Sequence, residues 1–156
     1  MLNIKRAEAF GAMMGKRAVA LGLAPVDDAG RRVFLVSGHS GAGKSTVAKR
    51  LGETLKLPVL SIDDHPRWRP MMDSDPEIRH IIAGSPERRR FLNAARGMAT
   101  EMLDSAKDGA VVEGTQLSLL GRSQLSRYPN RVLVTTPLQD LLKQRIERTK
   151  RKNIFS

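Results

Sequence analysis

The sequence predicts an α/β fold of three layers, in which helices cover both faces of a short parallel sheet. Short apolar runs at 33–37, 58–62, 110–113 and 131–135 are typical of buried strands. Segments with helical spacing separate these runs, and strands that alternate with helices form a parallel sheet covered on both faces. The right-handed crossovers that such helices impose give the strand order 2-3-1-4, numbered along the sequence.

The first two helices are predicted from apolar spacing. Residues 1–25 form an amphipathic extension ahead of the core, interrupted by charges that exclude a signal-peptide core. Residues 46–55 carry Val47, Leu51 and Leu55 at helical spacing, so a helix follows the first strand.

Prolines predict the remaining boundaries. Residues 65–75 contain two prolines and are expected to be largely loop. Asp75, Ser85 and Thr136 are each followed by proline, the pattern of an N-cap with proline at the first helical position. The helix after Ser85 is expected to run to about Lys107.

Bulk composition limits the partners and the compartment. The 156 residues suit one domain, 1–156, and include 27 Lys and Arg against 16 Asp and Glu, for a net charge of +11. This excess favours anionic partners such as nucleotides or nucleic acid. There is no cysteine, which excludes disulfides and thiolate metal sites and fits a cytoplasmic protein. No apolar stretch reaches the ~20 residues that cross a bilayer, so no membrane partner is expected.

The octapeptide GHSGAGKS, residues 38–45, lies between the first strand and the next helix. Its glycines allow main-chain N–H groups to turn inward around an anion, and the helix dipole adds at the same point. Lys44 supplies charge for the outer phosphates and for transfer, and the Ser45 hydroxyl is a ligand for Mg²⁺. We therefore predict an ATP–Mg²⁺ site formed by Gly38, Ser40, Gly41, Ala42, Gly43, Lys44, Ser45 and Thr46.

Carboxylates end the second and third strands, at the edge where ligands of parallel sheets bind. Asp63 and Asp64 are candidates for the base that accepts the proton of an attacking hydroxyl, with Asp63 preferred; the alternative is that they cap a loop or helix. Glu113 is expected to hold a magnesium-bound water or an acceptor hydroxyl. Thr115 is expected to hydrogen-bond the acceptor.

The last predicted helix carries six basic residues within ten positions: Lys143, Arg145, Arg148, Lys150, Arg151 and Lys152. It follows the fourth strand, where small P-loop kinases carry a lid whose arginines offset charge that develops on the transferred phosphate. Arg148 is the first candidate and Arg145 the second. The alternative is a solvated basic face.

Taken in order, these motifs resemble the zeta-toxin group of P-loop kinases. GHSGAGKST, the aspartate pair, VVEGT and TPLQDLLKQRIER match the group's glycine loop, aspartate base, E-G-T and lid, and Arg148 lies eleven residues past Pro137, as the group's lid arginine does. The resemblance covers residues 32 to about 150 and implies a P-loop NTPase fold with kinase activity. Phage-type polynucleotide 5′-kinases are similar in the loop, the aspartate pair and the lid arginine but lack the E-G-T, and uridine kinases also end their second strand with a D-D or D-S pair.

Two features depart from that pattern. Members usually continue past the lid into a fifth strand and a final helix, whereas this sequence ends at Ser156, which leaves Lys150, Arg151 or Lys152 in place of a second lid arginine. The extension 1–25 is not needed by minimal kinases, and it either covers the sheet edge or binds a protein partner. The expected organisation is thus this extension, a nucleotide-binding core at 32–150 and a basic lid or tail at 143–156.

Three functions follow from these observations. The preferred one is an ATP-dependent kinase of a small-molecule hydroxyl, on a nucleoside or a nucleotide sugar. The second is a polynucleotide 5′-hydroxyl kinase, which the +11 charge favours and for which Trp68, Arg67 and Arg69 would stack on a base, unless Trp68 serves in packing. The third is a non-catalytic P-loop protein that binds nucleotide or nucleic acid within a larger assembly.

Overall fold

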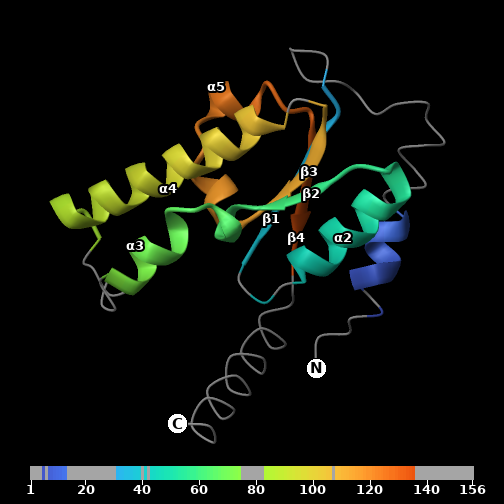
Figure 1. Cartoon of the computed structure of the whole chain (residues 1–156), viewed down its shortest axis with the longest axis horizontal. Coiled ribbons are helices and arrows are strands. Elements are labelled where there is room, and N and C mark those ends of the chain that lie inside the picture. Colours follow the sequence, from blue (N-terminus) through green and yellow to red (C-terminus); the bar gives the residue numbers. More distant parts are fainter. Residues whose placement is uncertain are drawn as a thin grey trace, which may run out of the picture.

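Four parallel strands form one sheet, in the order β2-β3-β1-β4 (Figure 1). The computed structural model describes residues 5, 7–13, 31–39, 41, 43–74, 83–106 and 108–135. The strands are β1 (Val33–Gly38), β2 (Val59–Ser61), β3 (Ala110–Glu113) and β4 (Asn130–Val134). The predicted parallel sheet and its order are confirmed, and each strand lies within one residue of its predicted bounds.

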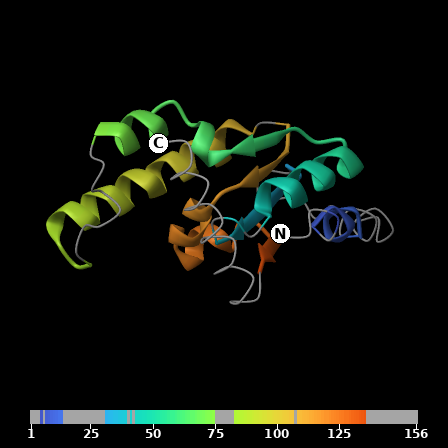
Figure 2. The same cartoon turned by 90° about the horizontal axis from the view of Figure 1, so that it is seen from below.

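Helices cover both faces of this sheet, so the central strands β1 and β3 are buried on two sides, whereas Val59 of β2 and Leu133 of β4 are exposed (Figures 1 and 2). On one face lies α2 (Lys44–Leu55), beside a helical segment at 7–13; on the other lies α4 (Pro86–Ser105). Successive residues of β1 serve opposite faces: Phe34 packs with Val47 and Leu51 of α2, whereas Leu35 packs with Met98 and Leu103 of α4. This double burial explains why β1 and β3 are continuous apolar runs.

The start of α4 follows the predicted capping pattern. The Ser85 hydroxyl accepts a hydrogen bond of 3.1 Å from the backbone N–H of Arg88, and Pro86 occupies the first turn, where its missing N–H costs nothing. The helix ends at Ser105, two residues before the predicted Lys107. The long helix between the second and third strands is therefore confirmed.

The prediction that residues 65–75 are largely loop is wrong, because Trp68–Ser74 forms the helix α3. Pro70 is its third residue and lies within the first turn, where backbone N–H groups have no acceptor inside the helix, so proline removes nothing there. Trp68 and Met71 are partly buried against the core below α4. The packing of Trp68 and Met71 against the core thus stabilises a helix where the two prolines predicted a loop.

The predicted N-terminal extension is described only in part. Residues 7–13 are helical, and Ala7 is buried in the cluster that α2 forms with the sheet. A Cβ at Gly11 would lie 2.9 Å from Arg50 Cβ, so this segment packs closely on α2. Apart from residue 5, the rest of 1–25 lies outside the described residues, as do the helix expected after Asp75 and the basic segment 143–156. Within the described part, no helix is long and apolar enough to cross a membrane.

Candidate functional site

Strand register aligns the ends of three neighbouring strands. Glu113 of β3 pairs with Ser61 of β2 on one side and with Val36 of β1 on the other. The chain segments that follow these three residues therefore begin at the same level of the sheet. Because all three strands are parallel, the glycine loop, the aspartate pair and the segment after Glu113 meet at one edge of the sheet.

Glycine is required at the end of β1 and again where the following loop meets α2. At Gly38, a Cβ would lie 2.3 Å from the backbone carbonyl oxygen of Val134, so only glycine allows β1 and β4 to approach this closely. Gly43 is the N-cap of α2 in the left-handed conformation, with φ 92° and ψ 19°. Gly41 also has a positive φ of 82°. The loop is thus a tight turn that delivers the chain onto the N-terminus of α2.

Lys44, the first residue of α2, folds back over this turn. Its Nζ donates a hydrogen bond of 2.9 Å to the backbone carbonyl of His39, and the residue is only 9% exposed. The His39 side chain is exposed. The ammonium group therefore lies within the turn, where an anion held by the loop would meet it.

Ser45 and Glu113 place two side-chain oxygens side by side next to the loop. The Ser45 hydroxyl donates to Glu113 Oε1 across 3.3 Å. Glu113 lies two residues after Val111, whose side chain packs on the α2 face, so its carboxylate points to the start of α2. Glu113 is 6% exposed, whereas Ser45 is exposed and Thr46 is partly buried.

These two oxygens are compatible with Mg²⁺. Magnesium prefers oxygen ligands and is usually held by one or two protein groups, with phosphate oxygens and water completing the shell. Among the described residues no group of three or more His, Cys, Asp or Glu side chains could hold a metal ion. A protein-only cage is thus not found in this part of the chain, and the Ser45–Glu113 pair is the arrangement that fits.

The two aspartates differ in how firmly they are held. Both are exposed and belong to a short 3₁₀ helix, η1 (Ile62–Asp64), which the buried Ile62 anchors to the core. Asp63 Oδ1 accepts a hydrogen bond of 2.8 Å from Gln116 Nε2. Asp64 makes no side-chain hydrogen bond among the described residues. The carboxylate of Asp63 is therefore tied to the segment that follows Glu113.

Gln116 is a site residue that the sequence did not reveal. It lies in η3 (Thr115–Leu119), directly after Gly114, and is 2% exposed. Thr115, the predicted acceptor-binding residue, is exposed beside it at the start of η3. The only sequence signal for Gln116 is its place three residues after Glu113, and this does not reveal that its partner, Asp63, lies 53 residues away.

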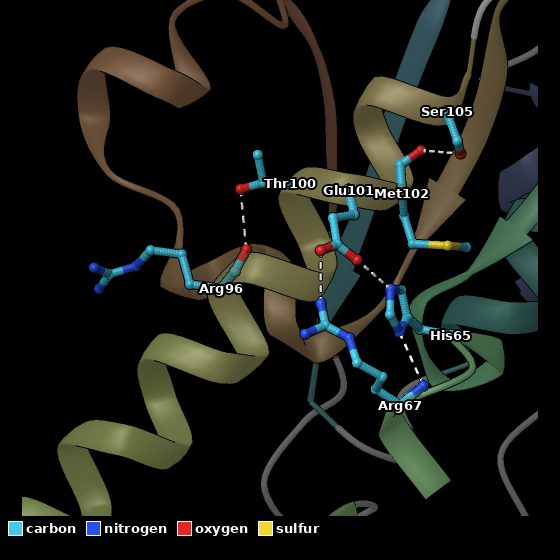
Figure 3. A network of polar contacts seen from close by, with 7 residues as sticks. All are labelled: His65, Arg67, Arg96, Thr100, Glu101, Met102 and Ser105. Atoms are coloured by element: carbon cyan, nitrogen blue, oxygen red, sulfur yellow. Dashed lines mark hydrogen bonds and ion pairs between the residues drawn. The ribbon is translucent and has the colours of Figure 1, made fainter.

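A second polar cluster holds the loop behind the aspartates (Figure 3). His65 is buried, and its Nε2 lies 2.6 Å from Glu101 Oε2; Arg67 Nη2 donates to Glu101 Oε1 at 2.6 Å. The backbone N–H of Arg67 donates to His65 Nδ1 at 3.1 Å. Because Nδ1 accepts a bond, the proton of the neutral ring is on Nε2 and is donated to Glu101.

Through this cluster α4 fixes two loops of the site. Glu101 holds the segment after η1, and Arg96 Nε donates to the Leu119 carbonyl at 2.8 Å, at the end of η3. Both ring nitrogens of His65 are occupied, so this residue serves to hold the loop. The positions of Asp63 and Gln116 thus depend on one helix.

Hydrogen bonds to His65, and then to Arg67, hold the pKa of the Glu101 carboxyl below its usual range. The folded-state pKa lies below the unfolded-state pKa, so the stabilisation is complete above the unfolded value and is lost as pH falls through the folded value. We expect Glu101→Gln to lower the free energy of unfolding near neutral pH, and this difference to shrink only as pH falls below the ordinary glutamate pKa of about 4.3 and through the lower folded-state value.

Urea unfolding across this range measures the effect. Glu53→Gln is a control, because Glu53 pairs with Arg50 at 3.1 Å on the outer face of α2 and both side chains are about half exposed. A difference between parent and Glu101→Gln that does not change with pH would contradict the expectation.

Trp68 packs against the core. It is partly buried and lies 6.2 Å from Phe91, with the rings tilted by 43°. Arg67 is paired with Glu101, and Arg69 with Asp73 at 3.4 Å. The packing alternative for Trp68 is therefore the one found.

The structure thus brings together Gly38, Gly41, Gly43, Lys44, Ser45, Glu113 and Asp63 at one sheet edge, with Thr46, Asp64 and Thr115 beside them. Ser40, Ala42, Arg145 and Arg148 lie outside the described residues. No model of a protein family matches the chain, and no curated protein matches it.

Proposed function

We propose that this chain is a P-loop kinase that transfers the γ-phosphoryl group of ATP to a hydroxyl of a small molecule, such as a nucleoside or a nucleotide sugar. One observation carries the proposal. The ends of three adjacent parallel strands bring a glycine loop with Lys44 and Ser45 beside Glu113 and Asp63. Open parallel sheets bind ligands at this edge.

The glycine loop and Lys44 serve to bind the phosphates of ATP. Backbone N–H groups of the loop and the N-terminus of α2 favour the anion, and the Lys44 ammonium neutralises the outer phosphates. Ser45 would hold Mg²⁺, with Glu113 on a bound water or on the acceptor hydroxyl. The metal supplies charge neutralisation for the phosphates during transfer.

Asp63 serves as the base for the acceptor. Its carboxylate accepts the proton of the acceptor hydroxyl as that oxygen bonds to the γ-phosphorus, and the bond from the γ-phosphorus to the β–γ bridging oxygen breaks to release ADP. Thr115 is exposed and lies two residues after Glu113, so its hydroxyl would hydrogen-bond an acceptor held beside Glu113. Phosphoryl transfer asks a protein mainly for positioning and charge, and these residues supply both.

Arg148 is proposed to close over the transferred phosphate from the basic segment. Arg148→Ala is expected to lower turnover much more than ATP affinity, because its contact strengthens as charge develops in the transition state. Arg148→Lys is expected to restore activity only in part, because a point charge does not bridge two oxygens as a guanidinium does. Steady-state kinetics and ATP titration measure the two quantities.

Arg131→Ala is the control for this variant, since Arg131 is exposed near the start of β4, at the opposite end of that strand from the glycine loop. Equal losses of ATP affinity and turnover in Arg148→Ala would contradict a lid role and leave the basic segment as a solvated face or docking surface.

A panel of acceptors tests the function itself. The full chain is incubated with γ-labelled ATP, Mg²⁺ and nucleosides, nucleotide sugars or 5′-hydroxyl oligonucleotides. Label in a nucleoside or nucleotide sugar supports the proposal. Label only in oligonucleotides favours the polynucleotide 5′-kinase, to which the net charge of +11 also points. ATP binding without transfer to any acceptor favours the non-catalytic binding protein.

A further inference from the structure

We infer that Gln116, given room by Gly114, is the positioning residue that holds Asp63 in the orientation needed for proton transfer. The inference deepens the proposed kinase function and rests on it for its catalytic part. It begins from one contact, Gln116 Nε2 to Asp63 Oδ1 at 2.8 Å, which joins the loops that follow β3 and β2.

The two partners differ in burial. Gln116 is 2% exposed, whereas the Asp63 side chain is exposed to solvent. An exposed aspartate samples several rotamers, and a donor fixed in the protein interior restricts it to one of them. The buried amide thus acts as an anchor for an exposed carboxylate. This is the arrangement that a base needs when its substrate arrives from solvent.

The oxygen of the Gln116 amide indicates that the residue serves to make the hydrogen bond to Asp63. Gln116 Oε1 is buried and has no hydrogen-bond partner among the described residues. A buried polar atom without a partner is costly and is usually explained by a specific role. An apolar side chain of the same size would fill the space without this cost. The bond to Asp63 is what the amide adds.

Gly114 leaves the space that the amide occupies. A Cβ at this position would lie 2.5 Å from Gln116 Oε1 and 3.1 Å from Ile62 Cβ. The Gly114 N–H also donates to the Val36 carbonyl at 3.1 Å, which ties this segment to β1. The backbone therefore has little freedom to move away. A side chain here would displace the Gln116 amide, so glycine at 114 and glutamine at 116 act as one unit.

Gln116 acts through Asp63 and not on the substrate, because its side chain is buried. Gln116→Met removes the amide while keeping the length of the side chain. We expect kcat to fall by about ten- to a hundred-fold, the scale on which misplacement of a reacting group acts, with ATP affinity unchanged. Gln116→Met combined with Asp63→Asn should be no slower than Asp63→Asn alone.

Gln124→Met is the matched control. The Gln124 amide donates to Thr100 Oγ1 at 2.8 Å, a bond of the same length, from the short helix α5 (Arg122–Leu125) to α4. We expect kcat of this variant to equal that of the parent. Equal kcat in parent and Gln116→Met, or an additive loss in the Asp63→Asn background, would overturn the inference.

Gly114→Ala tests the same unit from the other side. It is expected to reproduce the loss of kcat in Gln116→Met, because the new Cβ displaces the amide. Gly121→Ala is its control, since a Cβ at Gly121 meets no atom within 4 Å. Retention of parent kcat by a folded Gly114→Ala would contradict the role of Gly114.

A readout independent of turnover separates this inference from the proposed function. In the parent chain the side-chain amide protons of Gln116 should exchange slowly with solvent, and their NMR signals should shift in Asp63→Ala but not in Asp64→Ala. Absence of that shift in an active enzyme overturns the positioning role alone. The shift without phosphorylation of any acceptor overturns the catalytic part together with the kinase proposal.

Discussion

Asp63→Asn is expected to lower the rate of phosphoryl transfer by orders of magnitude while ATP affinity stays at the parent value. The amide has the shape of the carboxylate but does not accept the proton of the acceptor hydroxyl. General-base assistance contributes typically ~10²–10⁴-fold, so kcat should fall by that amount. Measurement requires the phosphorylated acceptor to be quantified in one experiment and ATP binding in another.

The structure makes this variant informative. Gln116 donates to Asp63 Oδ1, and the oxygen of asparagine accepts the same bond. The side chain should therefore stay in place, and the loss reports on proton transfer alone. Asp64→Asn is the matched control, because Asp64 is the exposed neighbour in η1. An inactive Asp64→Asn beside an active Asp63→Asn would reverse the assignment within the pair.

Features set by local spacing could be predicted from the sequence. The central strands β1 and β3 are apolar because helices cover both of their faces, and the positions and order of all four strands followed from their apolar runs and helical connections. The cap at Ser85 followed from the proline after it. Convergence of the glycine loop, Glu113 and Asp63 also followed, since parallel strands end at a common edge.

Contacts between distant residues could not be predicted in the same way. Gln116 meets Asp63 across 53 residues, and His65 meets Glu101 across 36. Neither pair produces a periodic pattern in the sequence, because each contact depends on how one loop packs against another element. The helix α3 was missed for a different reason: its proline lies in the first turn, where the penalty that proline carries inside a helix does not apply.

Lys44→Ala is expected to weaken binding of ATP–Mg²⁺ without unfolding the protein. Truncating one partner of a buried, hydrogen-bonded charge pair costs about 2–5 kcal/mol. This corresponds to a rise in Kd of roughly 30- to 4,000-fold. Isothermal titration with ATP in the presence of Mg²⁺ measures the change, and thermal unfolding checks that the variant is folded.

Two further variants separate the charge of Lys44 from its packing. Lys44 is 9% exposed, so alanine removes buried stem atoms as well as the ammonium group; Lys44→Met keeps the stem and removes only the charge. If the ammonium serves phosphate, Met and Ala should weaken ATP binding alike. Lys49→Ala removes an exposed charge from the same helix and should bind as the parent does. Parent-like affinity in Lys44→Met would mean that the loop holds its lysine for contacts within the protein, such as that with the His39 carbonyl, and the nucleotide site would then lose the residue on which it most depends.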